Sequence, residues 1–169
     1  VLKLPPEKVG ILDNFFDLGG HSLSSVQLIS RINDHFQRSL PFSVIFTNTD
    51  IAAFATLLSS EETASYDILI PIQSSGDAPP IFGIPGAGGM VLSLRPLARA
   101  LGTKHPFYGM EHRGLDGVTS PLTSVEETAQ ANIAAVKKVQ PQGPYRFIGH
   151  SYGGVVAYEM ARILLEQGE

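Results

Sequence analysis

Apolar residues in the first part of the chain recur at the spacing of α-helices. Between residues 22 and 36 they stand three or four positions apart, which predicts one long amphipathic helix. Residues 43–46 are expected to form a short helical turn, and Thr49 is expected to cap a further helix over residues 51–58. The first part of the chain therefore predicts a small helical bundle.

The segment ahead of these helices carries apolar residues without a helical period. We expect residues 9–17 to form a loop that folds Ile11, Phe15 and Phe16 inward. Residues 1–4 are expected to be the end of a helix. That helix would be the first of the bundle, clipped at its start.

The hydrophobic pattern changes after a polar stretch at residues 59–66, which indicates a linker. Beyond it, short apolar runs alternate with segments of helical period. Such alternation predicts parallel β-strands joined by helices that cover both faces of one sheet. The expected strands are residues 68–73, 80–84, 106–110 and 145–149, and the expected helices are residues 90–101, 124–139 (capped by Ser124) and 152–167.

A serine between two glycines stands where the last strand meets the last helix. Gly149, Ser151 and Gly153 match Gly-x-Ser-x-Gly, the pattern that places a nucleophilic serine on a tight strand-to-helix turn. Glycine is needed on both sides because the strained turn leaves no room for side chains beside the neighbouring strand and helix. The alternative is an ordinary glycine turn that contains a serine. The apolar strand before it and the helix after it favour the nucleophile.

A second glycine-rich turn, residues 85–89, follows the strand at residues 80–84. Such a turn can direct a backbone N–H group toward Ser151. With the N–H of Tyr152 it would form a two-donor oxyanion hole, in which each donor contributes roughly 2.7–4 kcal/mol of transition-state stabilisation. We therefore expect an acyl-transfer site at this edge of the sheet.

The tripeptide Gly-His-Ser occurs twice, and the copy at residues 20–22 has different surroundings. Ser22 lacks the second glycine, and no strand precedes it. It opens a helix, and the free amides and dipole of a helix N-terminus stabilise a phosphate group, so this serine can bear a phosphodiester. A serine that only caps the helix is common, and the residues by themselves favour that alternative.

Composition narrows the classes of function. The chain of 169 residues has a net charge of −4 and no cluster of Lys and Arg, which argues against a nucleic-acid partner. Because there is no cysteine, disulfides, thiolate metal sites and thiol catalysis are excluded, and we expect no metal. No apolar run approaches the roughly 20 residues that span a bilayer, so we expect no membrane association. These features are typical of a cytoplasmic protein.

Residues 68–169 resemble the N-terminal part of type I thioesterase domains, which release products from nonribosomal peptide and polyketide synthetases. The matching runs are residues 80–89 (PIFGIPGAGG), 140–145 (QPQGPY) and 149–154 (GHSYGG). The resemblance implies the α/β-hydrolase fold. It also implies that Ser151 is the nucleophile and that the backbone N–H groups of Ala87 and Tyr152 are the oxyanion donors.

The same resemblance places the acid and the histidine of the catalytic triad after Glu169, so the chain would lack both and would be a poor hydrolase alone. None of its five histidines is expected to be the base. The side chain of His150 is expected to point away from Ser151. His105 and His112 flank a strand and are expected to be surface or loop residues.

Residues 13–23 (DNFFDLGGHSL) closely resemble the signature of peptidyl carrier proteins, and the resemblance continues through Phe46 and residues 51–58. It implies a four-helix carrier bundle in which Ser22 receives 4′-phosphopantetheine. Residues 17–21 and Leu23 would form the surface read by the phosphopantetheinyl transferase and by catalytic partners. Polyketide carriers more often have Asp-Ser-Leu around this serine, so the His-Ser-Leu of this chain favours the peptide type.

Two domains are therefore predicted, a carrier at residues 1–60 and the N-terminal part of a thioesterase at residues 68–169, joined by a linker at residues 61–67. Ser22 would hold the acyl or peptidyl chain received from upstream condensation and adenylation modules, or from a ketosynthase. Ser151 would accept that chain as an acyl-enzyme and release it by hydrolysis or macrocyclisation. The open alternatives are a polyketide-type carrier–thioesterase, a carrier with a non-catalytic hydrolase remnant, and a free-standing serine esterase or lipase with an unrelated helical appendage.

Overall fold

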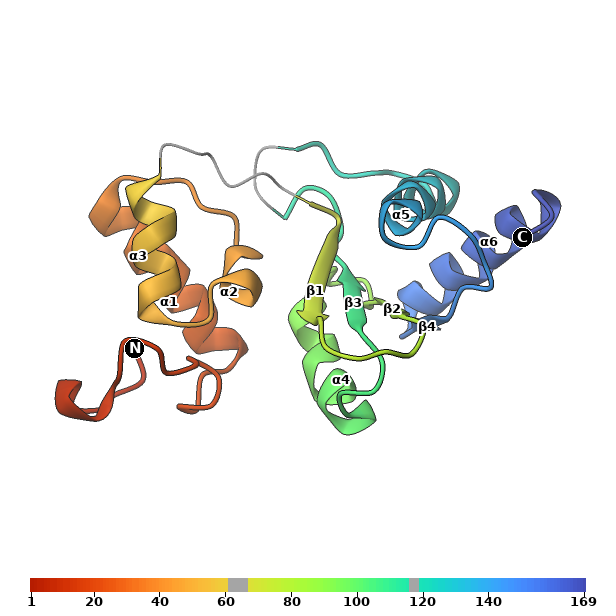
Figure 1. The fold of residues 1–169 in the computed structure, drawn as a ribbon. Helices are drawn as coiled ribbons and strands as arrows, with labels where there is room; N and C mark the ends of the chain where they lie inside the picture. The colour runs from red at the N-terminus through yellow and green to blue at the C-terminus, as the bar shows by residue number, and fades with distance from the viewer. Residues whose placement is uncertain (61–66, 116–118) are drawn as a thin grey trace. The chain divides into compact units, whose positions relative to one another are not determined.

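The chain folds into two compact units. The computed structural model describes residues 1–60, 67–115 and 119–169. The units are Val1–Tyr66 and Asp67–Glu169, and Figure 1 shows the helices and strands of each. The linker predicted at residues 61–67 lies outside the described residues, apart from Asp67.

The described part of the first unit is helical. Its elements are the 3₁₀ helix η1 (Pro6–Lys8) and the α-helices α1 (Ser22–Phe36), α2 (Val44–Thr47) and α3 (Ile51–Ser59). The three α-helices lie where the hydrophobic spacing predicts them. The helix end predicted at residues 1–4 is wrong, because these residues are not helical. Pro5 explains the difference, since a proline disfavours the helical conformation of the residue before it.

The capping residues of two helices differ from the prediction by one position, although both helices begin where predicted. Asp50, and not Thr49, caps α3, because its carboxylate accepts a hydrogen bond from the Ala53 N–H at 2.8 Å. At α1 the N-cap is His21, and Ser22 is the first helical residue. The alternative in which Ser22 serves as the cap is therefore wrong.

Aromatic residues from the loop ahead of α1 enter the core of the first unit. Phe15 and Phe16 are buried with their rings edge to face and the centroids 5.3 Å apart. The same prediction is wrong for Ile11, whose side chain is 65% exposed. The Ile11 carbonyl accepts a hydrogen bond from the Ala52 N–H at 3.0 Å, so this segment is held to α3 by its backbone. The other buried apolar residues of this unit are Ile29, Leu40, Val44, Ile45 and Phe54.

The second unit is built on a sheet that, in the described residues, has four strands in the order β1-β3-β2-β4. The strands are β1 (Leu69–Gln73), β2 (Ile81–Ile84), β3 (Phe107–Met110) and β4 (Phe147–Gly149). Strand β2 pairs in parallel with β3 and β4, whereas β1 pairs with β3 antiparallel. The prediction of a wholly parallel sheet is thus wrong for β1. The chain passes from β1 to β2 through residues 74–80 without a crossover helix, and a parallel connection needs one.

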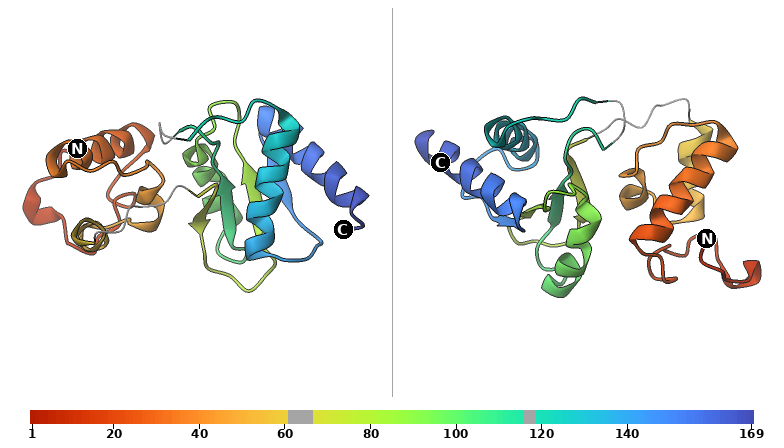
Figure 2. Two further views of the ribbon diagram at one scale, coloured as in Figure 1. Left: turned by 90° about the horizontal axis from the view of Figure 1, so that it is seen from above. Right: turned by 180° about the vertical axis from the view of Figure 1, so that it is seen from behind.

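Helices cover both faces of this sheet, as predicted. They are the 3₁₀ helix η2 (Val91–Leu94) and the α-helices α4 (Arg95–Leu101), α5 (Val125–Val139) and α6 (Tyr152–Glu166). Helix α4 packs on one face against Ile81 and Phe107. Helices α5 and α6 pack on the other face against Phe82 and Ile84, and Figure 2 shows these two helices on the same side of the sheet. Of the helices in the described residues, none is long and apolar enough to cross a membrane.

Helix α5 begins at the predicted cap. The Ser124 hydroxyl accepts a hydrogen bond from the Glu127 N–H at 3.1 Å. The Glu127 carboxylate accepts one in turn from the Thr123 N–H at 3.2 Å, and this bond holds the pKa of Glu127 below its usual value. The first bond satisfies an amide that the helix itself leaves unpaired, and the second ties the residue before the cap to the first turn.

Candidate functional sites

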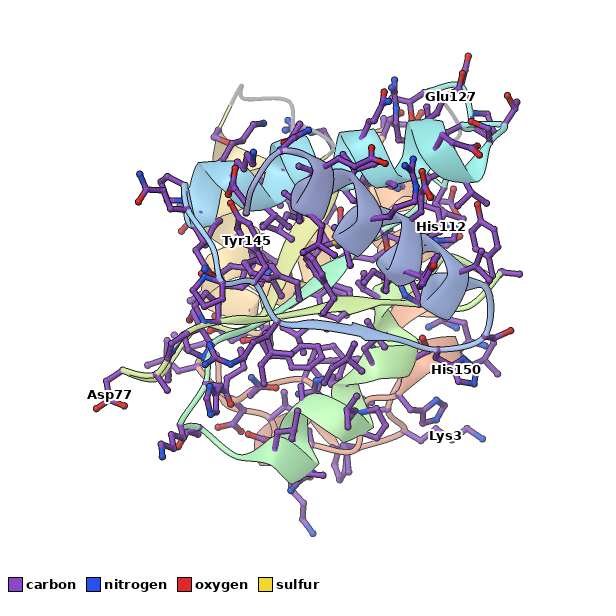
Figure 3. All side chains as sticks on the ribbon, turned by 90° about the vertical axis from the view of Figure 1, so that its right-hand side faces the viewer. Lys3, Asp77, His112, Glu127, Tyr145 and His150 are labelled. Carbon is purple, nitrogen blue, oxygen red and sulfur yellow. The ribbon has the colours of Figure 1, made fainter. Side chains whose placement is uncertain are left out.

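Ser151 stands at the turn between β4 and α6 with a backbone conformation that few side chains adopt. Its φ is 53° and its ψ is −122°. A non-glycine residue in such a region costs roughly 1–3 kcal/mol, and such strain is concentrated at functional sites. Ser151 is exposed, and the neighbouring His150 marks the turn in Figure 3.

The two glycines around Ser151 allow three backbone segments to approach one another. A Cβ atom on Gly149 would overlap the carbonyl oxygen of Gly153, and one on Gly153 would overlap the carbonyl oxygen of Ile84. These obstacles are backbone atoms, which cannot swing aside as a side chain can. The Gly-x-Ser-x-Gly pattern is therefore required by the contact among β4, α6 and the end of β2.

Backbone hydrogen bonds fix the same turn. The Gly153 N–H donates to the His150 carbonyl at 2.9 Å, and the His150 N–H donates to the Ile84 carbonyl at 3.2 Å. The chain after β2 also comes close, because a Cβ on Gly86 would lie 3.2 Å from His150 Nδ1 and 3.6 Å from Ser151 Cβ. The glycine-rich turn at residues 85–89 thus lies beside Ser151, as predicted.

One cavity, of about 250 Å³, lies between this glycine-rich turn and the start of α6. Ala87 and Tyr152, whose N–H groups are the predicted oxyanion donors, both line it. Ser151 does not line the cavity and stands one residue before Tyr152. The structure brings the two predicted donors together, while their role in catalysis stays a prediction.

Two cavity-lining residues were not selected from the sequence. Glu111, which is 3% exposed, and His112, which is half-buried, directly follow β3. His112 lies in a loop, as predicted, but not on the open surface, and its burial lowers its pKa. Their position directly after a predicted parallel strand could have identified them from the sequence. The carboxyl ends of parallel strands meet at one edge of a sheet, and ligand sites form there.

The start of α1 is reached through a glycine pair. Gly19 has a φ of 94°, which favours glycine. A Cβ on Gly20 would overlap the ring of Phe15, and the Gly20 N–H donates to the Phe15 carbonyl at 2.9 Å. The pair thus carries the chain tightly past a buried phenylalanine to Ser22.

Two buried serines then secure the first turn of this helix. The Ser24 hydroxyl accepts a hydrogen bond from the His21 N–H at 2.8 Å. The hydroxyls of Ser24 and Ser25 each donate to the His21 carbonyl at 2.9 Å. The first amides of α1, a helix of 15 residues, have no partners within the helix, and such an N-terminus stabilises a phosphate group. The backbone at Ser22 therefore fits a phosphodiester.

Comparison with known proteins gives a match for each unit. A family model described as a phosphopantetheine attachment site matches residues 1–58, and one described as a thioesterase domain matches residues 79–169. The dimodular nonribosomal peptide synthase of Bacillus subtilis (strain 168) is 40% identical over 170 residues, which cover 100% of this chain and 7% of that protein.

Two solved structures resemble the chain, one over nearly its whole length and one over about half of it. A holo four-domain nonribosomal peptide synthetase bound to AMP and glycine matches with a TM-score of 0.63 and 29% identity, over 97% of this chain and 12% of that one. The NocB thioesterase domain from the nocardicin cluster matches with a TM-score of 0.51 and 26% identity, over 56% of this chain and 42% of that one. The chain therefore spans a small part of the synthetases that it matches.

Proposed function

Because the chain belongs to the thioesterase-domain family and carries a phosphopantetheine attachment domain ahead of that domain, we propose that it is the carrier–thioesterase end of a nonribosomal peptide synthetase. The order of the two family matches along the chain supports this proposal. The relatives that match both units are large nonribosomal peptide synthetases. This supports a part of such a synthetase over a free-standing esterase.

Ser22 is the proposed attachment point of the cofactor. When bound, 4′-phosphopantetheine supplies a thiol on a flexible arm, and this thiol holds acyl groups as thioesters. The amides at the start of α1 would face the phosphodiester, and Gly19 and Gly20 carry the chain past Phe15 to this attachment point for a phosphopantetheinyl transferase. The exposed His21 and Leu23 would form part of the surface that this enzyme and upstream condensation and adenylation modules recognise.

Ser151 is the proposed nucleophile. Its Oγ attacks the carbonyl carbon of the delivered acyl group, and the new ester bond forms as the carbon–sulfur bond breaks. We propose that a histidine from the protein beyond Glu169 takes the hydroxyl proton and passes it to the departing thiol. Water, or a nucleophile within the acyl chain, then releases the product.

The N–H groups of Ala87 and Tyr152 would stabilise the oxyanion formed in both steps. Tyr152 opens α6, so the positive end of that helix dipole adds to the effect. The observation that carries the proposal is the backbone of Ser151, which is held at positive φ between two glycines that cannot bear side chains.

We also propose that the carrier is a four-helix bundle, with the domain boundaries predicted from the sequence. An apolar groove of about 600 Å³ is lined by Phe36 of α1, by Ile51 and Leu58 of α3, and by Val1 and Leu2, which are not helical. The apolar surface of α1 and α3 in this groove supports a further helix packed against these two.

Attachment at Ser22 is tested directly by mass spectrometry. Incubation with a phosphopantetheinyl transferase and coenzyme A should add one phosphopantetheine mass to the protein and none to Ser22→Ala. Ser30→Ala is the matched control, because Ser30 is an exposed serine on the same helix, and it should be modified fully. Modification of Ser22→Ala to the same extent would contradict the assignment.

A further inference from the structure

We propose that His112 is a positioning residue that keeps the backbone N–H groups of Ala87 and Tyr152 aligned as oxyanion donors. The inference rests on the proposed function, in which these groups act on the acyl group at Ser151. An oxyanion hole works only when its donors are already placed at hydrogen-bond distance from the developing charge. Here the donors belong to two elements, the turn after β2 and the first turn of α6, so their spacing depends on what lies between those elements.

His112 contacts the first of these elements through its backbone and its side chain. Its N–H donates to the Gly89 carbonyl at 3.2 Å. A Cβ on Gly89 would lie 2.7 Å from His112 Cβ and 2.9 Å from His112 Nδ1, so the side chain lies directly against this glycine. The glycine-rich turn therefore cannot move toward the end of β3 without meeting His112.

His112 contacts the second element through its ring. The rings of His112 and Tyr152 lie edge to face, with centroids 5.5 Å apart and planes at 78°, which is a favourable aromatic arrangement. Figure 3 shows His112 close to α6, the helix that begins at Tyr152. A single side chain thus touches both elements that supply the proposed donors, and Ala87, His112 and Tyr152 line the same cavity.

The role follows from the shape of the ring and not from its charge. Burial lowers the pKa of His112, which favours the neutral imidazole over a cation beside the oxyanion. A flat ring of similar shape should therefore keep the contacts with Gly89 and Tyr152. That expectation separates positioning from acid–base catalysis.

The test uses the full-length protein and a fluorophosphonate probe, which reacts with an activated serine. His112→Ala should slow labelling of Ser151 by about 10- to 100-fold, because small displacements of catalytic groups have effects of this size. His112→Phe should keep the rate within about threefold. His105→Ala is the matched control, since His105 lies before β3 with Nδ1 2.9 Å from the Pro79 carbonyl oxygen, and it should label normally.

Turnover of an acyl thioester gives a second readout that loss of packing alone would not produce. In His112→Ala the value of kcat should fall by the same factor as labelling while KM stays within about twofold. His112→Leu fills the space without a flat ring and should slow labelling and lower kcat as much as His112→Ala. It replaces the alanine variant in the test if that variant does not fold. Normal labelling of Ser151 in both His112→Ala and His112→Leu would overturn this inference and leave the proposed function standing. Labelling slowed as much in His112→Phe as in those two variants would do the same. Absence of labelling at Ser151 in the unaltered protein would overturn the proposed function and the inference with it.

Discussion

At the scale of residues, Ser151 holds a conformation that its own side chain opposes. Glycine adopts a φ of 53° with a ψ of −122° readily, whereas a residue with a Cβ does so at a cost. The close approach of Gly149 and Gly153 to neighbouring backbone imposes this conformation on the residue between them. A strained backbone at Ser151 is expected if the function needs a hydroxyl at this turn, because glycine would fit the turn without strain but has no hydroxyl.

Replacing Ser151 with glycine should therefore stabilise the second unit. Ser151→Gly is expected to raise the free energy of unfolding by about 1 kcal/mol relative to Ser151→Ala, although glycine also gains freedom in the unfolded chain. Urea unfolding followed by circular dichroism measures the difference. Ser151→Ala is the matched control, because it loses the hydroxyl and keeps the strain. Equal stabilities of the two variants would show that the backbone at this turn is not strained.

Local sequence patterns predicted the residues of the turn at Ser151. They missed His112, which only the tertiary fold brings to the site. Ser151 and its glycines follow from five consecutive letters, because their contacts are made within one strand–turn–helix unit. The contact of His112 with Tyr152 joins elements far apart in the sequence, so no local pattern reveals it. At α3, Thr49 and Asp50 are both good caps, and spacing alone does not choose between adjacent candidates.

At the scale of elements, the first turn of α6 packs closely on the end of β2 at Gly153. Gly153→Ala should lower the free energy of unfolding by about 1–3 kcal/mol and slow the labelling of Ser151, because the added Cβ overlaps backbone. The matched control is Gly154→Ala in the same turn, where the nearest atom would lie 3.7 Å away. This variant should be unchanged or more stable by up to about 1 kcal/mol. A loss in Gly154→Ala as large as that in Gly153→Ala would contradict the packing account.

A hydrogen-bonded cluster joins the residues after α6 to the connection before β4. The Tyr145 hydroxyl donates to the Glu169 carboxylate at 2.6 Å, and the Lys137 ammonium lies 2.6 Å from its other oxygen. Partial burial, and then the bond to Glu169, raise the pKa of Tyr145 to about 12, while the bond from Lys137 lowers the pKa of Glu169. Tyr145 is labelled in Figure 3.

This cluster predicts a loss of stability in alkali. Because the pKa of Tyr145 is higher in the folded state than its usual 10.0, its contribution is complete below pH 10 and is lost as the pH rises toward about 12. The urea midpoint should therefore fall more steeply over this interval in the unaltered protein than in Tyr145→Phe. Tyr158→Phe, at a tyrosine that is 74% exposed, should keep the steeper dependence. The same slope in the unaltered protein and in Tyr145→Phe would refute the prediction.

The type of each element was more predictable than its direction. Amphipathic spacing identified the α-helices of the first unit, and short apolar runs identified the four described strands. A short, mostly apolar strand such as β1 has the same sequence pattern whether it runs parallel or antiparallel, so its direction came only from the structure. Residues 1–4 carry an apolar pattern, but the proline after them prevents a helix.

At the scale of the whole molecule, the two serines of the repeated Gly-His-Ser form the donor and acceptor of one acyl group in our account. A carrier that precedes its thioesterase in the same chain presents the acyl group at a high effective concentration. The order of the two domains could be predicted from the sequence through its motifs. The identity of the acyl group could not, because the residues that select it are not marked by any motif in this chain.

Transfer between the two serines is the most direct test of this account. The full-length protein is loaded at Ser22 with one acyl-pantetheine, digested, and its peptides are located by mass spectrometry. With the proposed downstream histidine replaced, the acyl group should accumulate on the peptide that contains Ser151. With Ser151→Ala it should remain on the peptide that contains Ser22, and product release should cease. Release at the normal rate from Ser151→Ala, or acylation at another residue, would contradict the account.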